Sequence, residues 1–402
     1  MPETVAIILH WNTDYAEIPR VELPNVVAKS YQPIVDAFEG FEGTVCFNIT
    51  GHTIDYLVKH HPELVDQLKA LVTVGVVEMV ACGYSHPILP LLPLPRIRAQ
   101  LEGHVKRVEE VFGKRPKGVW PPELAVSPLI LAEFDRLGLE WTTLDHEHVE
   151  LAQTLGNDVN LFERRDKTVT EVLADAFWAE GRLDTLSQYR KAMKTMEAWN
   201  ERLTSPLERV MISGDRTMKG FLSSQSWWNG TKIALSNSVS LYKAEKHLKT
   251  VLSSQAKHLP LYTSDVEFFG YRELGGKVPS PASLVSFLST LKRHGVKTVS
   301  PSQIPTDEWP EEPKFVGTGS WYSDKSFRVW TDSEDNREYT RRLAEVYDFL
   351  CRKDWDSKLM AEVEPWLRIA ENSDPRGWAP LPERKHEAYS AIMTMYDHLG
   401  LF

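Results

Sequence analysis

Short apolar runs alternate with stretches of helical spacing through the first 150 residues, and this alternation is the strongest constraint on the fold. The runs typical of buried strands are 5–10, 44–49, 76–81, 118–120 and 140–144. The stretches with helical spacing are 26–38, 52–58, 62–74, 96–112 and 127–137. Strands that are separated by covering helices pair in parallel. The sequence therefore predicts an α/β fold with a parallel sheet.

Polar side chains follow these strands at the point where each strand ends. The set is His10 and Asn12, Thr50 and His52, Tyr84, Ser85 and His86, Glu123, and Asp145 and His146. The carboxyl ends of parallel strands meet at the same edge of a sheet, where α/β proteins bind their ligands. We therefore expect one site at one mouth of the fold.

Glu123 lies in the turn GVWPPELAVSP, residues 118–128, between an expected strand and the helix that follows it. Two prolines directly before Glu123 stiffen this turn, and Trp120 stands beside them. A carboxylate on a rigid turn after a strand is placed as an active-site acid would be. The competing interpretation is an exposed turn glutamate, because Glu is mostly a solvated residue.

The later part of the chain carries fewer strand signals. The elements expected there are a strand over 258–263, a helix over 281–294, a strand over 296–299, and helices over 336–353, 356–372 and 383–399. Asp265 and Glu267 follow the first of these strands. A proline- and acid-rich stretch, 305–314, precedes the last three helices, so the C-terminus is expected to form a small helical bundle.

Charge and composition exclude several classes of protein. The formal net charge is -10, which argues against nucleic-acid binding, because phosphate neutralisation needs clustered Lys and Arg. The 3 cysteines are widely spaced and suggest neither a disulfide framework nor a zinc site. The sequence has no apolar run of about 20 residues, so we expect no membrane span and a cytoplasmic protein. The 13 tryptophans favour a sugar ligand, because indole faces stack on sugar rings.

Four segments carry a more specific signal. They are LHWN (9–12), VEMVACGYSHPILPLLP (77–93), GVWPPELAVSPLILAEFDRLGLEWTTLDHEHV (118–149) and SDVEFFGYRE (264–273). In order and spacing they resemble the motifs of glycoside hydrolase family 57, and the loop SDPRGWAPL, 373–381, is a weaker echo. Asn12 stands where that family usually has a second histidine, so a sugar-hydroxyl contact is expected to differ there.

The resemblance implies an incomplete (β/α)7 barrel followed by a C-terminal helical bundle. Residues 1–310 would form the catalytic barrel, with an insertion around 181–257. Residues 311–402 would form the bundle, which would contribute a loop to the active site.

The resemblance also implies a retaining enzyme that acts on α-linked oligo- or polysaccharides, with an α-glucan as the first expectation. Glu123 would be the nucleophile and Asp265 the general acid/base, with their carboxyl groups about 5 Å apart. We expect Glu123 to be ionised and Asp265 to keep its proton at neutral pH, because burial and a neighbouring carboxylate raise a carboxyl pKa. Glu267, on the same strand face, is the alternative acid.

Further side chains are expected to bind the substrate. They are His10, His86, Trp120, Asp145, Glu267, Trp227, Trp228 and Trp378. The histidines would bond sugar hydroxyls, the tryptophans would stack on sugar rings, and Asp145 would orient a neighbouring group. We expect neither a cofactor nor a metal.

Two other functions fit the same strand ends. A metal-dependent polysaccharide deacetylase could use His10, His86 and Asp145 as ligands, although no compact pair of histidines lies beside an acid. The second alternative function is that of a carbohydrate-binding protein without catalytic activity. The sequence leaves open whether water or a second sugar accepts the glycosyl unit, because that choice depends on loop geometry. It also leaves open the sugar and whether the chain forms a homo-oligomer.

Overall fold

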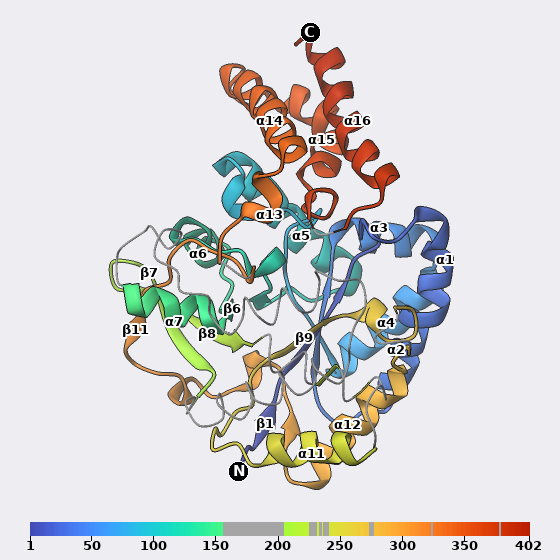
Figure 1. Cartoon of the computed structure of the whole chain (residues 1–402), viewed down its shortest axis with the longest axis vertical. Coiled ribbons are helices and arrows are strands. Elements are labelled where there is room, and N and C mark those ends of the chain that lie inside the picture. The colour runs from blue at the N-terminus through green and yellow to red at the C-terminus, as the bar shows by residue number, and fades with distance from the viewer. Residues whose placement is uncertain are drawn as a thin grey trace.

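The computed structural model describes residues 1–155, 205–224, 231–232, 235, 241–272, 277–322, 325–377 and 379–402. Two sheets of mostly parallel strands form its centre (Figure 1). The first sheet has the order β4 (Val77–Met79), β3 (Val45–Ile49), β2 (Ile7–Trp11) and β9 (Tyr262–Asp265), all parallel. The second has the order β11 (Pro313–Lys314), β7 (Leu207–Ser213), β8 (Arg216–Ser223), β6 (Trp141–Asp145) and β5 (Gly118–Val119). In this second sheet β7 and β8 are antiparallel and the other neighbours are parallel.

Single backbone bridges join the two sheets at two places. Ala81, just after β4, pairs with Val119 of β5, and Ser223 at the end of β8 pairs with Leu261, just before β9. Both bridges are parallel. A separate short pair consists of β1 (Thr4–Val5) and β10 (Lys297–Thr298). The strands β2, β3, β4, β5, β6, β8 and β9 therefore follow one another with their carboxyl ends on the same side.

The predicted α/β fold with parallel strands is confirmed. Strands expected at 44–49 and 140–144 match β3 and β6 to within one residue at each end. All five residues of β2 are buried, as expected for a strand covered on both faces. Gly118 is required in β5, because a Cβ there would lie 1.9 Å from the ring of Trp141 on the neighbouring strand.

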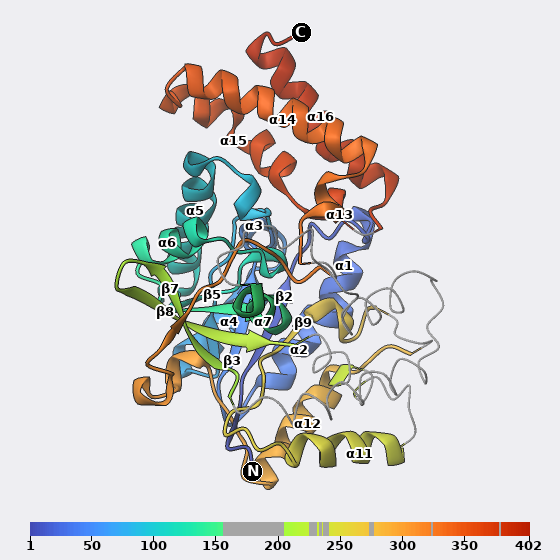
Figure 2. The same cartoon turned by 60° about the vertical axis from the view of Figure 1, so that its left-hand side comes forward.

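Helices cover the strands from outside (Figures 1 and 2). They are α1 (Leu23–Val26), α2 (Gln32–Phe38), α3 (Gly51–His60), α4 (Pro62–Val74), α5 (Leu94–Phe112), α6 (Pro128–Arg136), α7 (His146–Leu155), α11 (Leu241–Leu252) and α12 (Pro281–Arg293). As predicted, α4 begins at Pro62 and stops at Gly75, which has the left-handed φ of 83° that favours glycine.

The C-terminal helices stand together at one end of the molecule in both views. They are α13 (Arg328–Thr331), α14 (Glu334–Arg352), α15 (Ser357–Glu371) and α16 (Pro382–Leu399), and the last three pack around their own apolar core. Arg96 of α5 anchors them, since its fully buried guanidinium donates to Glu371 and to Glu364 of α15. The three helices predicted from periodicity are therefore present, with small shifts at their ends.

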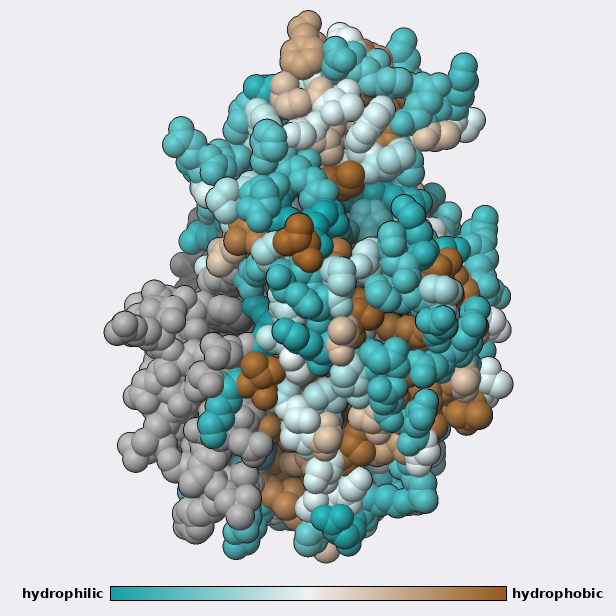
Figure 3. Space-filling view, turned by 90° about the vertical axis from the view of Figure 1, so that its right-hand side faces the viewer, coloured by the Kyte–Doolittle hydropathy of each residue, from teal (hydrophilic) through white to brown (hydrophobic). Residues whose placement is uncertain are grey.

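The face of the molecule shown in Figure 3 is mostly hydrophilic, with apolar side chains scattered over it. Among the described residues, no helix is both long enough and apolar enough to cross a lipid bilayer.

Candidate active site

The strand ends bring His10, Asp265 and Trp120 together, as the sequence predicted. His10 of β2 is the partner of Asp265 of β9 in the strand register. Its ring lies 4.6 Å from that of Trp120 and 4.7 Å from that of His86, measured between ring centres. His10 Nδ1 bonds to Asn48 Oδ1 at 2.7 Å, and Nδ1 is the donor because an amide oxygen only accepts. Burial lowers the pKa of His10, so its ring is neutral and Nε2 is an acceptor.

Glu123 lies on a strained turn just after β5. Within the 3-10 helix Pro122–Leu124, Glu123 has a φ of 58° and Leu124 a φ of 47°. Such left-handed conformations in residues other than glycine cost about 1–3 kcal/mol each and cluster at functional sites. Trp321 fixes the turn, because its backbone N–H donates to Glu123 O at 3.1 Å and its indole N–H donates to Glu123 Oε2.

A second carboxyl group, Asp374, lies beside Glu123. It belongs to the 3-10 helix η8 (Asp374–Arg376), which follows α15. His86 Nδ1 is 3.9 Å from Glu123 Oε1 and 3.8 Å from Asp374 Oδ2. Asn12 Nδ2 donates to Asp374 Oδ2 at 2.6 Å. Asn12, which stands where family 57 usually has a second histidine, thus binds the carboxyl group of Asp374 from the C-terminal part of the chain.

The carboxyl groups of this cluster bind protons more tightly than usual. Burial raises the pKa of Glu123 to about 7, and the charge of Asp265 adds to this shift against the lowering effect of Trp321. Burial and then the charge of Glu123 hold the pKa of Asp374 well above its ordinary value. Burial, followed by the neighbouring His10, keeps the pKa of His86 low. At neutral pH the cluster therefore consists of a neutral imidazole, a Glu123 carboxyl group that is about half protonated, and an Asp374 carboxyl group whose raised pKa favours the protonated form.

His86, Glu123 and Asp374 could also hold a divalent cation. Among the described residues, these three offer ligand atoms that all lie within 4.8 Å of one another. The ligand set that we considered for a deacetylase, His10, His86 and Asp145, is a different one. Asp145 is engaged elsewhere, by Lys325.

Asp265 lies near two cationic side chains, Arg272 and Lys232, and the hydroxyl of Tyr15. Tyr15 donates its hydroxyl to Asp265 Oδ2 at 2.8 Å, and Arg272 Nη1 lies 3.7 Å from the same oxygen. Burial alone would raise the pKa of Asp265, but the charges of Lys232 and Arg272, together with the hydrogen bond from Tyr15, hold the pKa below its ordinary value. The expectation that Asp265 keeps its proton at neutral pH is therefore wrong for the protein without a ligand. Glu123, expected to be ionised, has the higher pKa of the two.

Glu267 is fully buried in the 3-10 helix Val266–Phe268, which directly follows β9. The expectation that it shares a strand face with Asp265 is therefore wrong, because the strand ends at Asp265. Its Oε1 accepts from the backbone N–H of Asn12 at 3.2 Å and from the hydroxyl of Tyr31. Burial and then the charge of Asp265 raise the pKa of Glu267 to about 7. Because Tyr31 and Asn12 hold one of its oxygens, Glu267 is a fixed group with one oxygen left to use.

Several polar atoms around this site are buried without a hydrogen-bond partner. Within the described part of the chain they include His10 Nε2, His86 Nε2, Trp120 Nε1 and Glu267 Oε2. Unpaired buried polar atoms cost free energy, and they are kept where a ligand will satisfy them. Donors and acceptors that flank an indole face suit a ligand rich in hydroxyl groups.

Asp145 is held by partners other than the residues of this site. Its Oδ1 accepts from the backbone N–H of His148 at 2.8 Å, which caps α7, and forms an ion pair with Lys325 Nζ at 2.7 Å. Both side chains are almost fully buried, with exposed fractions of 1% and 3%. Lys325 Nζ also lies 3.4 Å from the carbonyl oxygen of Trp321, the residue that holds Glu123. Asp145 thus acts on the site indirectly, by anchoring the loop that carries Trp321.

Replacing Lys325 by methionine is expected to lower the free energy of unfolding by about 3–5 kcal/mol, because it leaves Asp145 buried without its charge partner. Urea denaturation followed by tryptophan fluorescence measures this loss. Lys106→Met, on the exposed face of α5, is the control and should change stability by less than about 0.5 kcal/mol. The double variant Asp145→Asn/Lys325→Met should recover much of the loss; equal losses in the single and double variants would contradict the pairing.

Three of the predicted substrate-binding residues, Trp227, Trp228 and Trp378, lie outside the described residues. The sequence analysis missed Asp374, Trp321, Tyr15 and Arg272. Of these, Asp374 and Arg272 were within reach, because they stand in the segments SDPRGWAPL and SDVEFFGYRE that had already been singled out.

Residues 7–313 match the family described as glycosyl hydrolase family 57. The chain belongs to this family.

Similar proteins align in sequence with only part of the chain. An alpha-amylase from Dictyoglomus thermophilum is 29% identical over 120 residues, which is 30% of this chain and 18% of that protein. A 4-alpha-glucanotransferase from Thermococcus litoralis is 26% identical over 178 residues, which is 44% of this chain and 26% of that protein. The chain thus matches about a quarter or less of the length of these relatives.

Solved structures resemble the whole chain. The 4-alpha-glucanotransferase from Thermococcus litoralis superposes with a TM-score of 0.70 at 14% identity, covering 99% of this chain and 60% of the other. A family 57 branching enzyme from Thermococcus kodakaraensis gives a TM-score of 0.69 at 15% identity, covering 99% of this chain and 90% of the other. At these identities the likeness is one of fold, and it extends beyond the segment matched by sequence.

Proposed function

We propose that this family 57 protein is a retaining enzyme that acts on α-glucans, with Glu123 as the nucleophile and Asp265 as the general acid/base. The observation that carries this proposal is the meeting of the two carboxyl groups at one strand-end mouth. His10, the strand partner of Asp265, has its ring 4.7 Å from that of His86, whose Nδ1 lies 3.9 Å from Glu123 Oε1. The unpaired polar atoms of His10, His86 and Trp120 beside the two carboxyl groups could form hydrogen bonds with the hydroxyl groups of a sugar. The amylase, glucanotransferase and branching enzyme among the similar proteins support an α-glucan as substrate.

In the proposed reaction the substrate-bound enzyme carries the proton of the pair on Asp265 and leaves Glu123 ionised. Glu123 then attacks the anomeric carbon while Asp265 donates that proton to the departing glycosidic oxygen. A covalent glycosyl intermediate forms on Glu123, and the leaving chain departs with a free hydroxyl. Asp265, now ionised, then takes a proton from water or from a sugar hydroxyl, whose oxygen displaces Glu123 from the anomeric carbon. The configuration at the anomeric carbon is retained because it is inverted twice.

Substrate-binding roles follow from the contacts around the two carboxyl groups. We propose that His10 and His86 bond sugar hydroxyls through their unpaired Nε2 atoms and that Trp120 lies against the sugar ring. We propose that Glu267 accepts a hydroxyl with its unpaired oxygen. Trp227, Trp228 and Trp378 remain proposals from the sequence.

We further propose that β2, β3, β4, β5, β6, β8 and β9 make up the incomplete seven-stranded barrel of residues 1–310. The parallel bridges at Ala81 and Ser223 support this order of strands. Because β8 lies within 181–257, the range expected as an insertion contributes a barrel strand and is not an insertion as a whole. Residues 311–402 would then be the helical bundle, and Asp374 supports a role for its loop in the active site.

The values of kcat/KM are expected to fall as the pH rises above about 7, because the reaction needs one proton on the carboxyl cluster and Glu123 loses its proton there. This fall of kcat/KM at high pH, the alkaline limb of the profile, reports an apparent pKa of the whole carboxyl cluster, because its members titrate together. Initial rates on a maltooligosaccharide across the neutral range measure it. Arg272→Met removes a cation 3.7 Å from Asp265 and should move the limb to higher pH. A profile that stays level to about pH 9 contradicts this assignment.

Incubation with a panel of α-linked oligosaccharides, followed by separation of the products by size, tests the proposed function. Shortened products alone mean hydrolysis, whereas longer and shorter products together mean transfer. Absence of turnover on every member of the panel would leave a carbohydrate-binding protein. A parallel incubation with a strong chelator should leave the activity unchanged, and loss with rescue by zinc would favour the metal-dependent alternative.

A further inference from the structure

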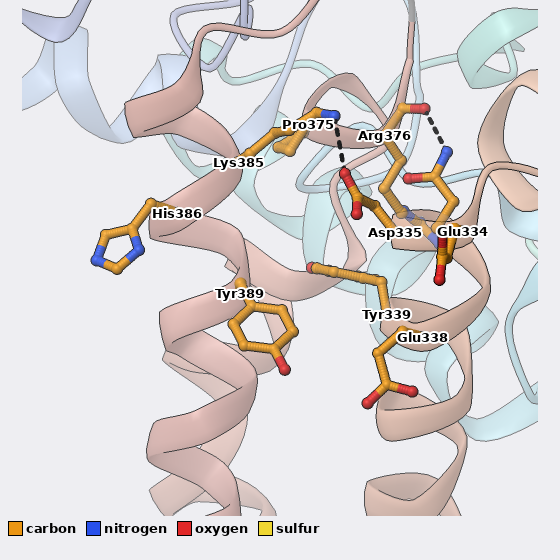
Figure 4. A pocket seen from close by; sticks show the side chains of 10 residues that line it. Glu334, Asp335, Glu338, Tyr339, Pro375, Arg376, Lys385, His386 and Tyr389 are labelled. Atoms are coloured by element: carbon orange, nitrogen blue, oxygen red, sulfur yellow. Dashed lines mark hydrogen bonds and ion pairs between the residues drawn. The ribbon is translucent and has the colours of Figure 1, made fainter.

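A cleft in the C-terminal part of the chain lies outside the strand-end site (Figure 4). It has a volume of about 480 Å³ and lies between the first turns of α14 and α16, against η8. Its lining includes Glu334, Asp335, Tyr339, Arg376, Lys385 and Tyr389. A cleft of this size admits a short oligosaccharide and lies within the usual range for small-ligand sites.

The walls of the cleft are held in place from behind. Asn336 of α14 donates its side-chain N–H groups to the carbonyl oxygens of Val329 and Arg376, each at 3.0 Å. Tyr339 donates its hydroxyl to Ala370 O at 2.7 Å, and the guanidinium of Arg376 lies 5.2 Å from the centre of its ring. These contacts tie α14 to η8, so the cleft is formed before any ligand arrives.

The polar groups of the cleft are of mixed charge. Glu334 and Asp335 face Lys385 and Arg376, and Lys385 Nζ lies 3.6 Å from Asp335 Oδ2 across the cleft (Figure 4). The Nε donor of Arg376 is buried and, within the described part of the chain, has no hydrogen-bond partner. A third acid of the lining, Glu338, is already paired with Arg341 and Arg342, so the charges left in the cleft are balanced. A balanced set of acceptors and donors favours a neutral ligand with many hydroxyls over an anion or a cation.

Tyr389 supplies the apolar surface that such a ligand needs. It is half-buried on α16, and Figure 4 shows its ring facing the cleft opposite α14. A tyrosine ring offers a flat face for the C–H groups of a sugar, with the hydroxyl at its wet edge. Stacking beside charged acceptors and donors is the combination that recognises a glucose unit.

We propose that this cleft is a second α-glucan-binding site, which holds a part of the chain that is not being cleaved. The inference rests on the proposed function for the nature of its ligand. The helix η8 forms the link between the two sites, because Asp374 faces Glu123 and His86 while Arg376, two residues later, lines the cleft. A glucan bound there is kept beside the catalytic cluster, which favours long substrates over short ones.

Calorimetry with maltoheptaose tests the proposal, in the Glu123→Gln background so that the ligand is not consumed. Glu123→Gln is expected to bind maltoheptaose at two sites, and Glu123→Gln/Tyr389→Ala at one. In the otherwise native chain, Tyr389→Ala should raise KM for amylose about tenfold, the loss expected for one aromatic contact, and leave kcat/KM on a short aryl maltoside unchanged. Tyr389→Phe keeps the ring and should retain the second site.

Asp335→Ala provides an independent variant, because this side chain is 81% exposed and its loss should not disturb folding. It should also weaken the second site. Two sites that persist in both the Tyr389→Ala and the Asp335→Ala variant, or only one site already in Glu123→Gln, overturn the cleft and leave the catalytic proposal standing. If Glu123→Gln binds no maltoheptaose at all and the native chain turns over no glucan, the proposed function fails and the cleft proposal fails with it.

Discussion

Glu123→Gln is expected to lower kcat on an α-glucan by about 10⁴- to 10⁶-fold, the range seen when an enzyme loses a residue of its reacting group. The amide nitrogen and oxygen cannot form the glycosyl ester, while the shape of the side chain and the indole N–H of Trp321 remain. Binding of the glucan should therefore persist. Single-turnover rates and calorimetry separate the two effects.

A rescue experiment identifies the role of Glu123 as well as its importance. In Glu123→Ala, azide can enter the space of the missing carboxylate and attack the anomeric carbon of an α-maltosyl fluoride once. The product should be a β-glycosyl azide, with inverted configuration, because a single displacement replaces two. Glu78→Gln is the matched control, since Glu78 is a strand carboxylate that accepts hydrogen bonds from Ser300 and Ser302. It should retain activity and show no azide product.

The position of Glu123 could be predicted from the sequence because local signals agree there. Its strand is a short apolar run, the prolines define the turn, and the helix after it is capped by Ser127, which accepts from Ile130 N. The same local reasoning located His10, His86, Trp120 and Asp265 at strand ends. The parallel order of the strands then brings these residues to one mouth.

Reasoning from strand ends does not locate Asp374 and Trp321, because they reach the site from irregular segments far along the chain; only the motif around Asp374 pointed to it. Neither follows a strand, and no periodicity marks a loop that folds back over a sheet. Their contacts depend on how the C-terminal helices dock, which buried groups such as Arg96 and Glu371 determine. Asp145 was expected to orient a neighbouring group, and the structure shows it capping α7 and pairing with Lys325.

Protonation is a further property that the sequence did not determine. Asp265 was expected to keep its proton because another carboxylate was near, but Lys232 and Arg272 lie near as well and reverse the shift.

Asp265→Asn is expected to lower kcat/KM on an unactivated α-glucan by about 10²- to 10⁴-fold, the usual contribution of general acid/base catalysis. Loss of the acid leaves the departing sugar oxygen without a proton. With an α-maltosyl fluoride the rate of the first step should fall much less, because fluoride departs without protonation. The covalent intermediate should then accumulate on Glu123. Rapid-quench measurement of a burst of fluoride tests this expectation.

Azide separates the role of Asp265 from that of its neighbours. With Asp265→Ala, azide should attack the accumulated intermediate without a general base and give an α-glycosyl azide, with retained configuration, opposite to the product of Glu123→Ala. Glu267→Gln is the matched control, because Glu267 follows the same strand and its Oε1 is held by Asn12 and Tyr31. Its variant should lose substrate affinity but give no azide product. A retained azide product from Glu267→Gln and none from Asp265→Ala would transfer the acid/base role to Glu267, whose pKa of about 7 already suits a proton donor.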